Sequence, residues 1–320
     1  MNLLSKKVLI VCLVMIFQIT AFAQEDETNT QVSFIYPLGT SGSGSLSQMN
    51  SFSFNVIWGM NGGLNGFELG GAGNYNVGNV SGLQIAGVTN INTKECTGVI
   101  FAGAANITLG KTSALLLSPI NITANEFNGL QFGIINFAKK LNGVQIGLIN
   151  ISNSSEEGLP IGFINIVKKG YYAIELSGNE TIYGNLTYKM GVKRFYSLFK
   201  FGYSEYNDKS IYNVGFGFGS LISIAEKHNI AIELSGNNLV YDNKWEGLNL
   251  LNMLDISYQY SLTDKVKIKA GPTFNVYISD RKPDGKFGTI DIPYTIYERT
   301  NNDNILTAWI GFNIGAVIEL

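Results

Sequence analysis

The stretch Gly143-Val-Gln-Ile-Gly-Leu-Ile-Asn150 decides the fold that this sequence predicts. In an extended chain, Val144, Ile146 and Leu148 fall on one side, and Gln145 falls on the other together with the glycines. A helix is disfavoured, because each of the two glycines would weaken it by about 1 kcal/mol. The unit therefore predicts one short strand with a single apolar face, followed by a polar turn.

This unit recurs along the chain at a period near 15 residues. The clearest further copies are Gly129–Asn136 and Gly158–Asn165, and weaker copies lie upstream. Each copy closes on an asparagine, at Asn74, Asn90, Asn106, Asn121, Asn136, Asn150 and Asn165. Such regular spacing indicates a repeat architecture. The asparagines either start turns or stack on one another as a ladder, and turn chemistry favours the first role.

Beyond residue 170 the repeat gives way to longer alternating segments. The expected strands are Tyr171–Ser177, Ile182–Met190, Phe195–Tyr203, Tyr212–Ser223, Asn229–Ser235, Leu250–Tyr260, Val266–Ile278 and Ile305–Glu319. The connections between them alternate between short and long, and 279–304 is the longest. Bacterial outer-membrane barrels have short periplasmic turns and longer outer loops, so this alternation favours a barrel.

The N-terminus carries the features of an export signal. A basic start at Lys6-Lys7 precedes the apolar run Val8–Phe17 and the small-x-small site Ala21-Phe22-Ala23, which predicts a signal peptide over residues 1–23, cleaved after Ala23. Residues 24–30 are expected to form a flexible polar leader. Only 14% of the chain is charged, against roughly 25% in soluble domains. No later segment has the roughly 18 apolar residues of a transmembrane helix.

Together these features predict an all-β fold: an antiparallel up-and-down transmembrane β-barrel of about 16 strands. The barrel is expected over residues 31–320, with repeat strands over 64–166 and longer strands over 170–320. A barrel of that size can hold a channel, so a passive pore for small solutes is the leading functional hypothesis. The predicted lumen-lining residues are Glu175, Glu233, Glu319, Gln84, Gln131 and Gln145. The glutamates are expected to pair inside the barrel with Lys189, Lys200, Lys267 or Lys269.

The sequence offers no convincing catalytic, cofactor or metal site. His228, the single histidine, lies in a short predicted turn and lacks the positioned partner that a general base needs. Cys96 is the single cysteine beyond the signal, which excludes an internal disulfide and disfavours a zinc site. The net charge of −2 gives no footprint for nucleic acid. We therefore expect a protein that is not an enzyme and needs no cofactor.

The units at 129–136, 143–150 and 158–165 resemble the Gly-Leu-Gln-Ile-Gly-Leu-Ile-Asn surface repeats of a family of Gram-negative surface proteins. In that family the repeats lead into a β-barrel, and the resemblance covers roughly residues 64–204. It implies an outer-membrane or surface location and no known reaction. The C-terminal strand resembles the strand by which outer-membrane barrels are recognised, so barrel-assembly machinery and outer-membrane lipid are the expected partners. The identity of a solute or surface ligand stays open.

Two alternatives come from other classes. The repeats could stack as a parallel solenoid carried on a smaller eight-strand barrel, with a role in surface binding or adhesion. The units lack an exposed polar face, which favours the antiparallel meander over this solenoid. The other alternative is an outer-membrane enzyme that uses His228.

Overall fold

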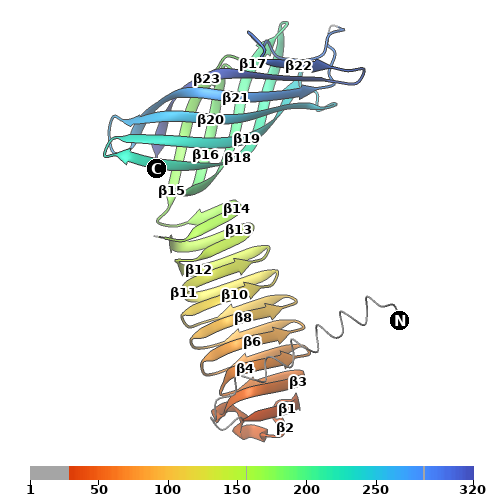
Figure 1. Ribbon diagram of the computed structural model, residues 1–320, viewed down its shortest axis with the longest axis vertical. Helices are drawn as coiled ribbons and strands as arrows, with labels where there is room; N and C mark the ends of the chain where they lie inside the picture. Colours follow the sequence, from red (N-terminus) through yellow and green to blue (C-terminus); the bar gives the residue numbers. More distant parts are fainter. Residues whose placement is uncertain (1–28, 156, 284) are drawn as a thin grey trace.

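The computed structural model describes residues 29–155, 157–283 and 285–320. The predicted signal peptide and most of the predicted leader lie outside the described residues. The chain forms two all-β parts, a parallel β-solenoid of about 8 turns and a separate closed barrel of eight antiparallel strands (Figure 1). The prediction of one 16-strand barrel is therefore wrong. Within the described ranges, no helix is long and apolar enough to cross a membrane.

The solenoid is built from stacked coils, and its strands form one 14-stranded sheet that wraps around into two facing stacks, one of longer and one of shorter strands in the first coils. A short 3-10 helix, η2 (Gly42–Ser47), lies near its start. The strands are β1 (Thr30–Ile35), β2 (Leu38–Gly39), β3 (Met49–Asn61), β4 (Gly63–Gly70), β5 (Gly73–Asn76), β6 (Val80–Ala86), β7 (Thr89–Asn92), β8 (Cys96–Ala102), β9 (Ala105–Thr108), β10 (Thr112–Leu117), β11 (Ile120–Phe132), β12 (Ile135–Leu141), β13 (Val144–Ser155) and β14 (Leu159–Val167). The strands from β3 to β14 pair with one another in parallel only.

The parallel register stacks each residue on its equivalent in the next coil. Gly66, Gly82 and Gly98 form one such column, with φ angles of 149°, 124° and 109°. A side chain is strained at such angles, and a Cβ on Gly82 would also overlap the carbonyl oxygen of Gly66. The close approach of successive coils and the positive φ therefore favour glycine at these three positions.

The predicted repeat units differ from the observed strands in extent as well as in pairing. The unit Gly82–Asn90, expected as one strand that ends in a turn, contains the end of β6, a link and the start of β7. Alternation along a strand determines which side chains share a face, and it does so equally in parallel and antiparallel sheets. The link at Gly87-Val88 carries the chain from β6, which pairs with β4 and β8, to β7, which pairs with β5 and β9, instead of reversing it into a hairpin. The repeats consequently form a solenoid and not a meander.

The barrel contains all eight strands expected beyond residue 170. They are β15 (Tyr171–Asn179), β16 (Gly184–Val192), β17 (Phe195–Tyr206), β18 (Lys209–Ala225), β19 (His228–Tyr241), β20 (Asn249–Ser261), β21 (Val266–Ser279) and β23 (Ile305–Glu319). Neighbours along the chain pair antiparallel, and β15 pairs with β23 to close the barrel. A short strand, β22 (Tyr297–Thr300), adds to β23 from the longest loop.

The last solenoid coil packs against the outer wall of the barrel. Asn165 donates a hydrogen bond to the Ser197 hydroxyl on β17 at 2.8 Å, and Ser197 donates to the Gly162 carbonyl oxygen at 2.7 Å. The Phe163 ring lies 5.2 Å from that of Phe199 and 4.4 Å from that of Phe216, between ring centroids. The solenoid therefore extends sideways from the barrel wall and not from either barrel mouth (Figure 1).

Candidate functional site

A continuous asparagine ladder runs through the solenoid interior. Each side-chain amide donates to the carbonyl oxygen of the next asparagine, at 2.9 to 3.2 Å from Asn74 to Asn165. At one end Asn55 donates a hydrogen bond to Asn74, and at the other end Asn165 donates to the Ser197 hydroxyl of the barrel. The closing asparagines therefore form the ladder, not the turn contacts that turn chemistry favoured. A neutral amide can stack on itself in this way because it is both donor and acceptor.

The three glutamines expected in a barrel lumen lie inside the solenoid. Gln145 donates to Gln131 at 2.7 Å, and Gln131 donates to Thr123 at 3.2 Å. Gln84 donates to the buried carboxylate of Glu68 at 2.8 Å. These residues line no channel, because the expected 16-strand barrel does not exist and each side chain is fully buried.

Glu68 is a buried carboxylate held by neutral amides. It accepts hydrogen bonds from Asn55 at 3.1 Å and from Asn76 at 2.8 Å, in addition to contacts with Asn61 and Gln84. Burial raises the pKa of Glu68, and the amide hydrogen bonds partly offset this rise. No ion pair of Glu68 is found within the described ranges.

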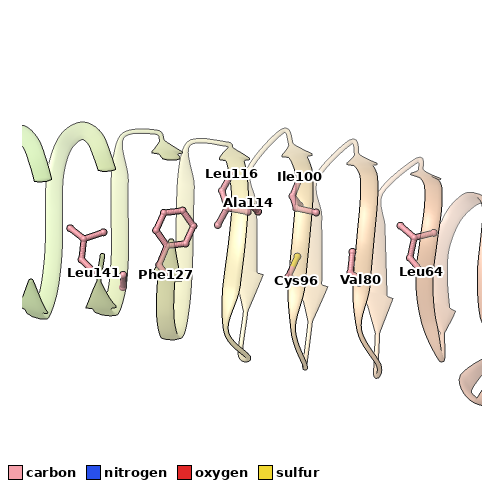
Figure 2. Packing of buried hydrophobic residues seen from close by; sticks show 9 residues of the cluster. Leu64, Val80, Cys96, Ile100, Ala114, Leu116, Phe127 and Leu141 are labelled. Carbon is pink, nitrogen blue, oxygen red and sulfur yellow. The ribbon is translucent and has the colours of Figure 1, made fainter. Parts of the chain in front are cut away.

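The solenoid interior also contains an apolar cluster. Leu64, Val80, Cys96, Phe127 and Leu141 belong to one packed cluster that runs across successive coils (Figure 2). Burial raises the pKa of the Cys96 thiol to about 12. Because reactivity needs the thiolate, this cysteine is a packing residue.

The centre of the barrel holds a ring of two lysines and two glutamates. Lys189 contacts Glu175 at 2.5 Å and also contacts Glu233. Lys269 contacts the same two carboxylates, at 2.7 and 3.3 Å. All four side chains have 0% exposure. The Tyr196 hydroxyl donates to Glu233 at 2.7 Å and adds a further contact to the ring.

The ring and its surroundings fill the barrel along its length. Lys200 pairs with Asp255 at 2.8 Å in the same layer of the barrel. The positive and negative charges of this layer are therefore equal in number. One apolar cluster lies towards the short turns and another towards the long loops. The longest loop packs onto the second cluster through Ile290, and the Thr289 amide donates to the Tyr277 hydroxyl at 2.9 Å. The described side chains thus occupy the space that a channel would need.

The other predicted residues lie at the barrel rim. Glu319 pairs with Lys267 and, at 3.6 Å, with Lys193, beside a shallow polar pocket formed by the short turns. His228 begins β19, and its ring contacts the Tyr258 hydroxyl on the outside of the barrel. Among the residues that the structure describes, no group of three or more His, Cys, Asp or Glu side chains could hold a metal ion.

Sequence reasoning did not single out Asp255 or Ser197. A usable signal for the central ring was present: the sequence Ile-Glu-Leu-Ser-Gly-Asn occurs at 174–179 and again at 232–237, and each copy supplies one ring glutamate. Ser197 carries no comparable signal, because its partner in the ladder comes from a different architecture.

The outside of the solenoid is apolar on both broad faces. On one face the outward columns are Phe52, Phe67, Leu83, Val99, Leu115, Leu130, Val144, Leu159 and Phe54, Leu69, Ile85, Phe101, Leu117, Phe132, Ile146, Ile161. On the other they include Ile91, Ile107, Ile122, Phe137, Ile151 and Ile166. Both broad faces are thus apolar while amides and hydroxyls are buried inside, which is unusual for a solenoid in water.

The two edges of the solenoid differ sharply. The apolar edge, where the chain passes from the longer to the shorter strand, carries Val88, Ala104, Pro119, Ile134, Leu148 and Phe163. The charged edge, on the opposite side, carries Lys94, Glu95, Lys111, Glu126, Lys139, Lys140, Glu157, Lys168 and Lys169. Leu148 is 61% exposed, so the apolar edge is not covered by the chain itself.

No family model matches the chain, and neither a curated protein nor a solved structure matches it. Its function is therefore argued from the geometry of the barrel and the solenoid.

Proposed function

We propose that this chain is a non-catalytic outer-membrane protein, in which the barrel is a sealed membrane anchor for the solenoid. The outward side chains of β23 support insertion: Ile310, Phe312 and Ile314 are 46%, 55% and 62% exposed. Barrel strands of 9 to 17 residues suffice for a membrane that needs about 9–11. Lipid is the solvent in which such a belt is stable.

The filled interior is the observation that carries the anchor role. A small barrel of eight strands is just wide enough for side chains to fill it. Here the filling includes the ring of Lys189, Lys269, Glu175 and Glu233, and burying those charges is tolerable because each is paired. This argues against the passive pore that the sequence favoured.

The place where the solenoid joins the barrel argues against adhesion at the outer surface. The chain passes from Lys169 into β15 at the end of the barrel that carries the short turns. In bacterial barrels the short turns face the periplasm. We therefore assign the solenoid to the periplasmic half of the protein.

Folding the purified exported chain into planar bilayers tests the anchor. We expect a mobility on gels that changes on heating, resistance of membrane-inserted protein to urea extraction, and no conductance steps. Uniform single-channel steps from the folded chain would contradict the sealed interior. Release of the protein by urea would contradict membrane insertion.

A further inference from the structure

The charged side chains of the solenoid are concentrated on one of its two edges, and no contact within the chain explains this distribution. Between residues 29 and 170, each described charged side chain except Glu68 lies on the charged edge. Both broad faces and the apolar edge are free of charge over all coils. An exposed apolar surface of this extent, many columns wide and long, marks a surface that meets another apolar phase.

The two edges are aligned with two different levels of the barrel wall. The charged edge ends at Lys169, next to Lys193 and Arg194 in a short turn of the barrel. The apolar edge ends at Phe163, which packs on Phe199 and Phe216 in the middle of the wall. One coil thus reaches from the rim of the barrel to about half its height.

We infer that the solenoid is itself embedded in the membrane. It lies on its side in the leaflet that is level with the short turns, with its apolar edge towards the bilayer centre and its charged edge at the phospholipid head groups. This inference rests on the proposed insertion of the barrel, and the orientation of the barrel makes the leaflet the periplasmic one. The partner of the broad faces is lipid acyl chain, the same phase that covers the barrel belt.

The dimensions of a coil fit one leaflet. The outward apolar stretch from Val99 to the edge at Ala104 spans five residue steps, about 16 Å at the rise of a strand. Half of a hydrocarbon core of roughly 30 Å is about 15 Å. With strands about 4.8 Å apart, a stack of about 8 turns extends about 40 Å along the membrane plane. The solenoid would therefore displace lipid from one leaflet only.

The composition of the charged edge fits phospholipid head groups. Its described charged residues are six lysines and three glutamates. They are Lys94, Lys111, Lys139, Lys140, Lys168, Lys169, Glu95, Glu126 and Glu157. Lysines near a membrane surface attract anionic groups. An amphipathic element with this division lies in the interface and does not span the bilayer.

Continuity with the barrel favours lipid over a protein partner. The Phe163, Phe199 and Phe216 contact joins the apolar surface of the solenoid to the outer wall of the barrel without a polar break. A protein partner would have to cover both broad faces and the apolar edge while the adjoining wall stayed in lipid. A single bilayer leaflet covers all of these surfaces at once.

Depth measurements on single-cysteine labels test this arrangement. Leu148→Cys on the apolar edge, Val99→Cys on a broad face and Lys139→Cys on the charged edge are each labelled with the fluorophore NBD in the full exported chain, with Phe201→Cys as the barrel reference. Cys96 is fully buried and stays unlabelled. The proteins are folded into phosphatidylethanolamine and phosphatidylglycerol vesicles, and doxyl-labelled phospholipids and aqueous iodide serve as quenchers.

We expect doxyl lipid to quench Leu148→Cys, Val99→Cys and Phe201→Cys strongly, with Leu148→Cys closest to a doxyl group deep in the chain. Iodide should quench Lys139→Cys and leave the other three nearly unchanged. If iodide quenches Leu148→Cys as well as Lys139→Cys while Phe201→Cys stays protected, the solenoid lies in water and the inference is overturned although the anchor stands.

Two other results are also decisive. Protection of Leu148→Cys from both quenchers would mean that a second copy or another protein covers the edge, which overturns the inference. Exposure of Phe201→Cys to iodide would remove the proposed membrane anchor and the inference with it.

Discussion

The solenoid and the barrel both turn apolar side chains outward and polar ones inward, but they satisfy the inner polar groups in opposite ways. The solenoid uses a ladder of identical neutral amides from Asn74 to Asn165. The barrel uses oppositely charged side chains such as Lys189 and Glu175. The difference follows from strand direction.

Parallel in-register strands stack each residue on its own equivalent. A buried polar side chain can therefore repeat from coil to coil only if it can hydrogen-bond to a copy of itself. An amide meets that condition, and a column of lysines or glutamates would repel itself. Antiparallel strands place different residues opposite each other, and closing the barrel brings Lys269 near Glu175 across the interior. Opposite charges can therefore meet there.

Removing one charge from the barrel ring should have the largest effect. Lys189→Met leaves Glu175 and Glu233 with Lys269 as their one shared ring cation, and breaking a buried pair in this way costs about 3–5 kcal/mol. Urea unfolding in detergent, followed by heat-modifiable mobility, measures the loss. The double variant Lys189→Met/Glu233→Gln restores a neutral ring and should recover part of it. A single variant as stable as the parent would show that the ring does not hold the barrel.

Interrupting the ladder should have the next largest effect. Asn121→Ala removes the donor to Asn136 at 3.0 Å and leaves a cavity, at a combined cost of about 2–4 kcal/mol to the solenoid. Hydrogen exchange of the solenoid amides should report the loss, while barrel amides stay protected. The matched control is Asn125→Ala at an exposed position of β11 where the register shifts, which should change little. Equal effects of the two substitutions would argue against the ladder as a structural element.

Filling the glycine column should cost less. Gly82→Ala places a Cβ at a φ of 124° and against the Gly66 carbonyl oxygen, with an expected cost of about 1–3 kcal/mol. The control is Ala114→Gly, since Ala114 occupies the same column in a later coil and should lose little. Thermal unfolding followed by circular dichroism compares the two. A neutral Gly82→Ala would mean that the coils can separate without penalty.

The same contrast explains how far the sequence could predict this fold. The barrel strands were predictable because their alternation, their loop lengths and the outward side chains of Ile310–Leu320 all agree. In the repeats, the period and the outward side of Leu148 follow from the sequence pattern, but alternation states neither the direction of the neighbouring strand nor the bend that divides most units between two strands. The information lay instead in Gly82 and Asn90, whose equivalents stack only when the coils run parallel.

The candidate sites were predictable to the same limited extent. Glu175 and Glu233 could be assigned to a barrel interior from one strand each, whereas the packing of Asn165 on Ser197 depends on how two separate parts meet. The absence of a polar outer face argues against a solenoid only if the solenoid lies in water. In this chain the same absence is the observation from which lipid contact is inferred.

The smallest effect is expected for the ion pair on the charged edge of the solenoid. Lys111 and Glu126 lie 3.8 Å apart, and the lysine side chain is 65% exposed, so solvent screens the pair. Lys111→Ala should change the free energy of unfolding by about 0–1 kcal/mol, far less than Lys189→Met in the barrel. Urea unfolding of both variants at low and at high salt checks this, because only an exposed pair weakens with salt. A loss of stability for Lys111→Ala as large as that for Lys189→Met would show that opposite charges, and not amides, hold the solenoid together. The contrast between the solenoid and the barrel would then fail.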